Sequence, residues 1–315
     1  MGLEEHVPHE EGDAPMVQLI TRLDDRPVLG VRMGNISLLR LDRAGGLAPG
    51  NKSFKLRGAL ADARRRGVNR LVSFGGAWSN HLHALAAVGR EAGMETVGLV
   101  RGEVTEAETA TLADARRWGM RIERVSRAAY RLRNEPEYLA SIERRCAPCL
   151  VIPEGGADPA GVKGCVAIAE LVRQAAPRVR RIAVAVGTGT TLAGLAYGLD
   201  DSYEIAGISA LKGAADLEHR VAAALRACEA SSLACWSVLH DYHCGGFGRV
   251  SPGLREFILE FERIHGVDLE PVYTGKMLYA LHSQLRKKAA LQGEPILAIH
   301  TGGLQGRRGF SWLAP

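Results

Sequence analysis

The sequence predicts an α/β protein of two lobes, in which helices cover parallel sheets. The chain has 315 residues, which is long for one hydrophobic core and short for three. Short apolar runs alternate with helical patterns along most of its length, as in parallel α/β proteins. Three glycines, Gly67, Gly93 and Gly119, are equally spaced, and each follows a helical pattern and precedes an apolar run. These observations favour a sheet of repeated helix and strand units.

The equally spaced glycines define a small lobe. A glycine just past a helix end adopts the left-handed conformation that stops the helix. Strands are therefore predicted at residues 70–74, 96–100 and 121–125, and a fourth short strand at residues 150–153 closes the lobe. We predict that this small domain spans residues 55–160.

A second α/β series forms the large lobe. Residues 161–174 are predicted as a helix, and the continuous apolar run 182–186 is typical of a strand buried on both faces. Further strands are predicted at 204–208 and 295–299, and a strand-rich segment at 28–41 joins the same sheet.

The large domain is therefore predicted to be discontinuous. It comprises residues 1–54 and 161–315, with the small domain inserted between them. Residues 1–15 are acidic, contain few apolar residues and show no helical or strand periodicity. We therefore expect them to be disordered.

Composition excludes several classes of function. The formal charge of +5 comes from scattered arginines, and neither finger spacing nor interleaved aromatics indicate nucleic acid. No apolar run reaches the roughly 18 residues of a membrane span, and the N-terminus does not resemble a signal peptide, so we expect a cytosolic protein. The pair Cys146 and Cys149 lacks a second Cys or His pair at usable spacing. The six cysteines are thus expected to be thiols, and no metal site is predicted.

The most informative short stretch is 50–55, where Lys52 lies in the first turn of a predicted helix. A lysine near a helix start can act as a covalent catalyst when polar surroundings lower its pKa, because its neutral amine condenses with an aldehyde. A lysine alone at such a place is usually a solvated surface charge. Other parts of the chain must supply its partners.

A phosphate site is predicted where the strand 182–186 runs into a loop of glycine and threonine and then a helix. Backbone N–H groups and the positive end of a helix converge there. The spacing matches neither the nucleoside-triphosphate loop nor the dinucleotide pattern, so a small monophosphate is favoured over a merely tight turn. The loop comprises Gly187, Thr188, Gly189, Thr190 and Thr191.

Polar residues stand at three further element ends. Ser79, Asn80 and His81 open a helix after the first strand of the small lobe, which suits a substrate carboxylate, although Ser79 or Asn80 could simply cap the helix. Tyr273 precedes another helix and could transfer protons, and Thr301 ends a strand and could meet a ring nitrogen. Each of these signals is weak alone, but ligands of parallel α/β sheets bind at the carboxyl ends of the strands, where these residues are predicted to lie.

Taken together, these blocks resemble the pyridoxal-phosphate dependent family of 1-aminocyclopropane-1-carboxylate deaminases and D-cysteine desulfhydrases. The resemblance extends from about Leu19 to Gly303, and it implies a tryptophan synthase β-subunit-like fold and a homodimer. The matching blocks are Asn51-Lys52-x-x-Lys55-Leu56, Gly75-Gly76-x-x-Ser79-Asn80-His81, Pro153-Glu154-Gly155-Gly156, Gly161-Val162-Lys163-Gly164, Pro271-Val272-Tyr273-Thr274-Gly275-Lys276 and His300-Thr301-Gly302-Gly303.

The resemblance also implies roles for individual residues around pyridoxal 5′-phosphate. Lys52 would bind the cofactor covalently, Asn80 would hydrogen-bond its phenolic oxygen, and Thr301 would approach its pyridine nitrogen. Lys55 and the loop 187–191 would hold the phosphate. Catalysis would fall to Lys52, Ser79 and Tyr273. The expected contacts of a small amino-acid substrate are Ser79, Asn80, His81, Trp78, Gly156, Phe247 and Tyr273.

Within the family, Thr274 after Tyr273 and the sequence Ser-Asn-His favour the desulfhydrase branch, and so β-elimination to pyruvate, ammonia and sulfide. Two departures bear on the substrate: Phe247 stands where the family usually has a tyrosine, and Trp78 where it often has a glutamine. The alternatives are a cyclopropane deaminase, another amino-acid deaminase, a racemase or a β-replacement enzyme. A protein that binds the cofactor or a phosphate metabolite without turnover is the non-enzymatic alternative.

Overall fold

The structure, a computed structural model, describes residues 19–103, 108–230, 233–287 and 293–313. The disorder expected for residues 1–15 lies outside these residues.

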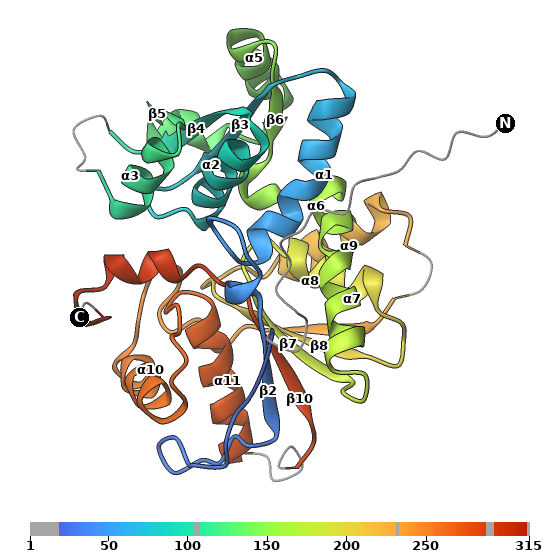
Figure 1. Cartoon of the computed structure of the whole chain (residues 1–315), viewed down its shortest axis with the longest axis vertical. Coiled ribbons are helices and arrows are strands. Elements are labelled where there is room, and N and C mark those ends of the chain that lie inside the picture. The colour runs from blue at the N-terminus through green and yellow to red at the C-terminus, as the bar shows by residue number, and fades with distance from the viewer. Residues whose placement is uncertain (1–18, 104–107, 231–232, 288–292, 314–315) are drawn as a thin grey trace, which may run out of the picture.

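Two sheets form two lobes, one above the other in Figure 1. The large lobe holds a six-stranded sheet of order β1-β2-β10-β7-β8-β9, and the small lobe a four-stranded sheet of order β5-β4-β3-β6. All neighbouring strands are parallel except β1 and β2. The strands are β1 Ile20–Arg22, β2 Ile36–Arg40, β3 Arg70–Gly75, β4 Glu95–Arg101, β5 Arg121–Val125, β6 Leu150–Ile152, β7 Arg181–Val186, β8 Glu204–Ser209, β9 Cys235–Leu239 and β10 Ile296–His300.

Helices cover both faces of each sheet, as parallel strands require. The α-helices are α1 Asn51–Arg65, α2 Asn80–Ala92, α3 Ala110–Arg117, α4 Arg127–Arg131, α5 Pro136–Cys146, α6 Pro159–Gly164, α7 Val166–Ala175, α8 Thr190–Gly198, α9 Leu217–Ala227, α10 Pro252–His265 and α11 Thr274–Lys287. Short 3-10 helices are η2 Leu41–Arg43, η3 Glu154–Gly156, η5 Leu304–Gly309 and η6 Ser311–Leu313. The prediction of a two-lobed α/β fold is confirmed.

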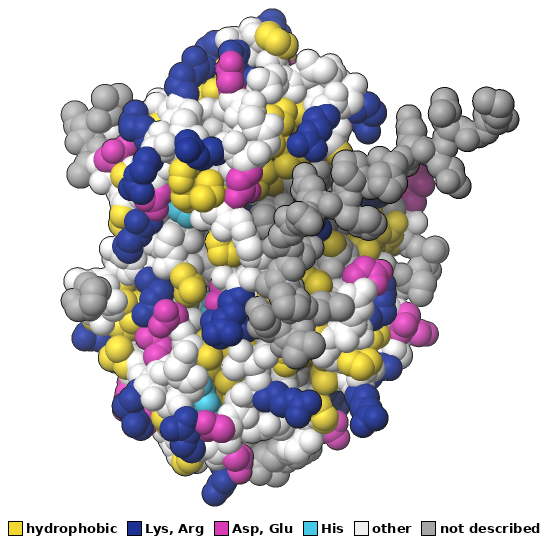
Figure 2. Space-filling model, in the orientation of Figure 1, with side chains coloured by type: hydrophobic (Ala, Val, Ile, Leu, Met, Phe, Trp, Pro, Cys, Tyr) yellow, Lys and Arg dark blue, Asp and Glu magenta, His cyan; other side chains and the backbone are white. Residues whose placement is uncertain are grey.

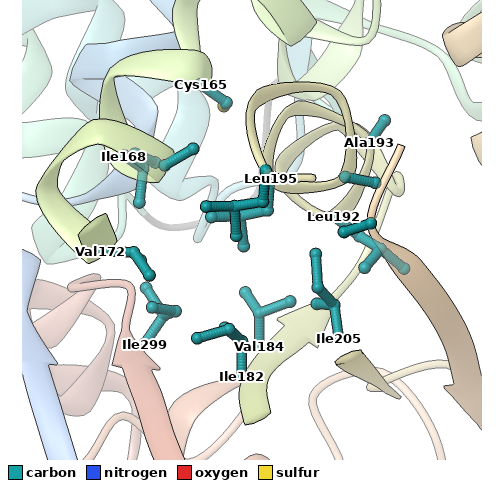
Figure 3. Close-up of a cluster of buried hydrophobic side chains, with 14 of the residues drawn as sticks. Cys165, Ile168, Val172, Ile182, Val184, Leu192, Ala193, Leu195, Ile205 and Ile299 are labelled. Carbon is teal, nitrogen blue, oxygen red and sulfur yellow. The ribbon is translucent and has the colours of Figure 1, made fainter. Parts of the chain in front are cut away.

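The alternation of side chains along β7 builds two cores. Ile182 and Val184 face α7 and α8, where they pack with Leu195 in the cluster of Figure 3. Ala183 and Ala185 face the opposite side, against α10 and α11. A strand that is apolar on both faces therefore has helices on both, as its continuous apolar run predicts. Each fully buried aliphatic side chain contributes roughly 1.5–3 kcal/mol.

The predicted helix stops of the small lobe are confirmed. Gly67, Gly93 and Gly119 have φ of 66°, 67° and 94°, the left-handed region in which glycine pays no steric penalty. The strands that follow them are β3, β4 and β5, each within two residues of its predicted limits. These three strands and β6 lie inside the range 55–160 predicted for the small domain, whose boundaries stay a prediction.

Three parts of the large lobe differ from the prediction, and the first is the edge strand β1, which lies before the strand-rich segment predicted at 28–41. The helix expected at 161–174 is two helices, α6 and α7, which meet at Cys165. Gly164 there lies against α1 and Cys165 lies against Gly194 of α8, so close contacts on two sides redirect the chain. The edge strand β9 was not predicted, because its residues alternate between partial and full exposure and lack a continuous apolar run.

Glycines let α1 and α6 approach closely. A Cβ on Gly164 would lie 2.2 Å from the carbonyl oxygen of Phe54, and a Cβ on Gly58 would lie 2.7 Å from that of Ala160. No other residue fits at either place without displacing a helix. The position of α1, the helix that begins at Asn51, therefore depends on these contacts.

The surface and the cysteines of the described residues can be compared with the composition. On the face shown in Figure 2, Lys and Arg side chains lie among Asp and Glu side chains and form no large patch of one sign. No helix of the described residues is long and apolar enough to cross a membrane. All six cysteines are free, and the described part of the chain holds no cluster of three His, Cys, Asp or Glu side chains that could bind a metal.

We expect Gly164→Ala to destabilise the protein by about 1–3 kcal/mol, because the new methyl group overpacks the contact between α6 and α1. Urea unfolding followed by circular dichroism measures the change. Ala61→Leu, which enlarges a side chain on the exposed side of α1, is the control and should change the free energy of unfolding little. Equal stability of Gly164→Ala and wild type would contradict the proposed contact.

Candidate functional site

The site is built where the start of α1 meets the end of β10. Gly50 and Gly302 form an antiparallel bridge, and the backbone N–H of Asn51 donates to the carbonyl oxygen of Thr301 at 3.1 Å. Gly50 has φ of 136°, and a Cβ there would lie 2.6 Å from the Thr301 oxygen. This contact brings Lys52 next to Thr301 although 249 residues separate them in sequence.

The Lys52 amine is linked to the loop that follows β7. Its Nζ donates to Asn51 Oδ1 at 3.1 Å, and Asn51 Nδ2 donates to Thr191 Oγ1 at 2.8 Å. Burial and the neighbouring Lys55 ammonium lower the pKa of Lys52 to about 7, although the charge of Glu270 opposes the change. Near neutral pH much of this amine is therefore unprotonated and nucleophilic.

The predicted phosphate loop opens α8. Gly189, with φ of 91°, is the N-cap of that helix and has no side chain with which to cap it. The hydroxyls of Thr188 and Thr190 hydrogen-bond to each other at 2.9 Å. The first N–H groups of a helix have no partner within the helix, so this loop offers donors and a positive dipole to an anion.

Lys55 is joined to the same loop through the turn at Gly155 and Gly156. Its Nζ donates to the carbonyl oxygen of Gly155 at 3.4 Å, and burial lowers its pKa. The turn at Gly155 and Gly156 packs between Thr188 and Lys55: a Cβ on Gly155 would lie 2.8 Å from Thr188 Cγ2, and a Cβ on Gly156 would lie 3.2 Å from Lys55 Cβ. Both glycines also have positive φ. The turn thus brings Lys55 and the phosphate loop together.

In the small lobe, the start of α2 faces this region. Ser79 is its N-cap, and Ser79 Oγ accepts from the N–H of Leu82 at 3.2 Å. Asn80 Oδ1 accepts a hydrogen bond from Gln305 Nε2 at 2.6 Å. Ser79 therefore caps the helix, as considered above. Because its Oγ only accepts in that bond, the hydroxyl proton is still available for donation.

His81 is buried in its neutral form. Ser73 Oγ donates to the carbonyl oxygen of Ile152 at 2.7 Å, so it accepts from His81 Nε2 at 2.9 Å. Burial and the charges of Lys52 and Lys55 lower the pKa of His81 to about 3. Its Nδ1 is then an acceptor, buried and without a partner among the described residues. The imidazole offers no positive charge to a carboxylate, so a carboxylate at this helix start would rely on N–H and hydroxyl donors.

Tyr273 lies against the phosphate loop. A Cβ on Gly187 would lie 3.1 Å from Tyr273 Cε1, and Lys52 Nζ lies 5.9 Å from the centre of the tyrosine ring. Burial and the nearby Glu270 carboxylate raise the pKa of Tyr273, so its hydroxyl keeps its proton. Gly187 is thus needed for the tyrosine to approach the end of β7.

Phe247 and Trp78, the two residues that differ from the family pattern, lie at the exposed edge of the site. Phe247 is 58% exposed and makes an edge contact with Tyr273, with ring centres 6.1 Å apart. Trp78 is 42% exposed, and its indole packs on Gly309, where a Cβ would lie 3.3 Å from the ring. One aromatic comes from each lobe, and neither lies as deep as Lys52.

A buried ion pair supports β10, the strand that ends just before Thr301. His300 Nδ1 lies 3.1 Å from Asp42 Oδ1, and Arg40 binds the same carboxylate at 2.6 Å. Burial alone would raise the pKa of Asp42, but the bonds from His300 and Arg40 hold it well below its usual range. His300 Nε2 also contacts the carbonyl oxygen of Asp268 at 2.9 Å.

The sequence predicts no role for three residues of the site. Asn51 lies in a matching block without a role of its own, and Gln305 lies just after the last matching block. Glu270 was missed altogether: its carboxylate accepts from the N–H groups of Val272 and Tyr273, both at 2.7 Å, and burial raises its pKa to about 7. An acidic residue shortly before a helix start is a capping signal that could have indicated it.

The assembled groups fit a small phosphorylated aldehyde. An amine with lowered pKa, a phosphate loop and a strand-end threonine meet at one place, and a buried acceptor on His81 lacks a partner. Lys52, Thr191, Thr301, Tyr273 and His81 are brought together here, while Trp78 and Phe247 are largely exposed.

Comparisons with known proteins agree with this fit. The family model of the pyridoxal-phosphate dependent enzymes matches residues 46–302. A Pyrococcus horikoshii protein provisionally named 1-aminocyclopropane-1-carboxylate deaminase is 30% identical over 93% of each chain. The D-cysteine desulfhydrase of Klebsiella pneumoniae is 29% identical, over 92% of this chain and 94% of that protein. The crystal structure of a 1-aminocyclopropane-1-carboxylate deaminase homologue superposes with a TM-score of 0.78, at 25% identity, over 95% of this chain and 97% of that one.

The resemblance read from the motifs is therefore confirmed, and so is the cofactor, pyridoxal 5′-phosphate. The chain belongs to the family of pyridoxal-phosphate dependent enzymes, in the group of lyases and deaminases that contains these relatives.

Proposed function

We propose that this enzyme catalyses β-elimination from a small D-amino acid, with D-cysteine converted to pyruvate, ammonia and sulfide. The observation that supports this best is the pairing of Lys52 with Tyr273, whose ring centre lies 5.9 Å from Nζ. Burial moves the pKa values of the two groups in opposite directions, to about 7 for the amine and upward for the phenol. At neutral pH the lysine can accept a proton while the tyrosine can donate one.

In this proposal, the residues around Lys52 hold the cofactor. Lys52 would bind it covalently, Asn80 would donate to its phenolic oxygen, Thr301 would meet its ring nitrogen, and Lys55 would help to hold its phosphate. The bound cofactor supplies an electron sink for the bond to the α-hydrogen. A threonine partner leaves the ring nitrogen nearer neutral than a carboxylate would. The phosphate is held by the loop residues Gly187, Thr188, Gly189, Thr190 and Thr191.

The protein groups then divide the proton transfers. The Lys52 amine takes the α-proton, the carbon–sulfur bond breaks with its electron pair going to sulfur, and the Tyr273 hydroxyl protonates the leaving thiolate. The proton on Lys52 replaces the one that Tyr273 has given. The released enamine takes up one water and yields pyruvate and ammonia, so that D-cysteine and water balance pyruvate, ammonia and hydrogen sulfide.

The substrate carboxylate is proposed to lie at the start of α2. Ser79 donates its free hydroxyl proton, and the adjoining backbone N–H groups of Asn80 and His81 add donors at the positive end of the helix. Gly156 gives room beside His81, where its missing Cβ would lie 3.8 Å from Cε1. Trp78 and Phe247 at the rim select the side chain.

The second candidate is a 1-aminocyclopropane-1-carboxylate deaminase. The Pyrococcus relative, which has that provisional name, supports it at 30% identity. Against it, Thr274 does not provide a carboxylate: its hydroxyl accepts from the N–H of Glu270 at 3.0 Å and donates to the Glu270 carbonyl oxygen at 3.2 Å. A homodimer and a cytosolic location stay predictions.

The first prediction concerns the substrate. Among a panel of D- and L-amino acids with 1-aminocyclopropane-1-carboxylate, D-cysteine should give keto acid and sulfide in equal amounts, at least about tenfold faster than L-cysteine. Keto acid is measured by a coupled dehydrogenase and sulfide colorimetrically. Release of 2-oxobutanoate from the cyclopropane with no sulfide from D-cysteine would favour the second candidate instead.

A second prediction tests the lowered pKa of Lys52. Since the unprotonated amine reacts, the rate at which cofactor-free protein regains its visible absorbance with pyridoxal phosphate should rise about tenfold from pH 6 to pH 8. An ordinary lysine, with a pKa near 10.5, would show about a hundredfold rise over this range. Stopped-flow absorbance distinguishes the two, and Lys52→Ala should form no borohydride-stable adduct.

A third prediction concerns Tyr273. Tyr273→Phe removes the hydroxyl but keeps the ring against Gly187, so turnover should fall about 10²–10⁴-fold while the cofactor is retained. Steady-state kinetics and the cofactor spectrum report the two effects separately. Tyr203→Phe, which removes the hydroxyl of another buried tyrosine at the start of β8, is the control and should keep wild-type turnover. A Tyr273→Phe enzyme of undiminished kcat would exclude the hydroxyl as the proton donor.

A further inference from the structure

The segment that follows β10 connects the two lobes. In Figure 1, η5 (Leu304–Gly309) lies between the small lobe and α10. Arg307 forms an ion pair with Glu262 of α10 and donates to the carbonyl oxygen of Leu269 at 2.7 Å, both in the large lobe. Arg308 forms an ion pair with Asp114 of α3 in the small lobe. The segment is thus held from both sides.

Gln305 occupies the middle of this connection and reaches the site itself. Its Nε2 donates to Asn80 Oδ1 at 2.6 Å, across 225 residues of sequence. Both side chains are partly buried. Gln305 therefore occupies the oxygen of the Asn80 amide. The NH₂ group of the same amide is the end that can bind a ligand.

Neighbouring glycines determine where that NH₂ group lies. A Cβ on Gly303 would come within 2.6 Å of Asn80 Nδ2, so only glycine leaves room for it. Gly303 has φ of 82° and stands two residues after Thr301, at the end of β10. Asn80 Nδ2 is thereby placed beside the strand end that is proposed to meet the cofactor ring.

We propose that Gln305 is a positioning residue, which turns the Asn80 amide so that its NH₂ group faces the phenolic oxygen of pyridoxal phosphate. A phenolic oxygen that carries negative charge requires a donor, and an amide can present a donor or an acceptor depending on its rotation by 180°. As long as Gln305 Nε2 donates to Oδ1, the NH₂ group is the end of the Asn80 amide that is left to face the cofactor. The inference rests on the contact proposed between Asn80 and the cofactor.

Gln305→Glu tests the orientation directly. A carboxylate can only accept, so it would draw Asn80 Nδ2 toward itself and present Oδ1 to the cofactor. We expect the Kd for pyridoxal phosphate to rise at least about tenfold, as loss of a hydrogen bond to a charged group implies. The pH at which the visible absorbance of the bound cofactor changes should shift as well. Gln305→Ala, which leaves the amide free to turn, should weaken binding less.

Two comparisons separate positioning from loss of structure. Gln174→Glu makes the same chemical change on an exposed face of α7 and should leave both the Kd and the absorbance unchanged. In an Asn80→Ala background, Gln305→Glu should cause no further loss of affinity, because the residue through which it acts is gone. Circular dichroism and thermal unfolding of each variant report whether the fold is retained.

The inference is overturned if Gln305→Glu binds pyridoxal phosphate with wild-type affinity and absorbance. It is equally overturned if Gln305→Glu lowers the affinity for pyridoxal phosphate by the same factor in the Asn80→Ala background. A third contradicting result is an Asn80→Ala protein that binds the cofactor with wild-type affinity. Cofactor titration needs no amino-acid substrate. If wild type binds the cofactor but eliminates no D-amino acid, the proposed function fails while the result on Gln305 stands.

Discussion

The close contact between Gly50 and Gly302 is the constraint on which the rest of the site depends. A Cβ on Gly302 would lie 2.8 Å from the Cα of Gly50, and a Cβ on Gly50 would lie 2.6 Å from the oxygen of Thr301. Only two glycines allow the start of α1 to join the end of β10. Through this contact the helix that carries Lys52 is placed against the strand that carries Thr301. The close packing of α1 on α6 then holds its direction.

A common electrostatic effect acts on the groups around Lys52. Burial lowers the pKa values of Lys52, Lys55 and His81, and it raises those of Glu270 and Tyr273. Each group is thus moved toward its neutral form. Burying ionisable groups in this way costs folding stability, and the cost is accepted where neutral amines and phenols are needed for proton transfer. The large apolar clusters on both faces of the six-stranded sheet offset it.

Side chains of both lobes meet at the edge of the site. Trp78 of the small lobe packs on Gly309, and Phe247 of the large lobe contacts Tyr273. The ion pairs of Arg307 and Arg308 hold the segment between them, with Gln305 in contact with Asn80. Trp78 and Asn80 of the small lobe therefore both contact the same short segment.

Local patterns by themselves determined much of this protein. The strands β3 to β8 and β10, the glycine helix stops, the glycine and threonine loop before α8, and the helix starts near Lys52 and Ser79 were all predicted from short stretches, because caps and apolar runs act over a few residues. Several such blocks in order were enough to indicate the family and its cofactor, which the comparisons confirm. The roles given to individual site residues stay predictions.

Only the tertiary structure decided how these pieces meet. Asn51 bonds Thr191 across 140 residues, and Gln305 bonds Asn80 across 225. The break at Cys165 follows from contacts with α1 and α8, and the neutral state of His81 follows from burial beside two lysines. No local pattern carries such information, since a hydrogen bond between distant residues and a pKa lowered by burial both arise from the packing of the whole chain.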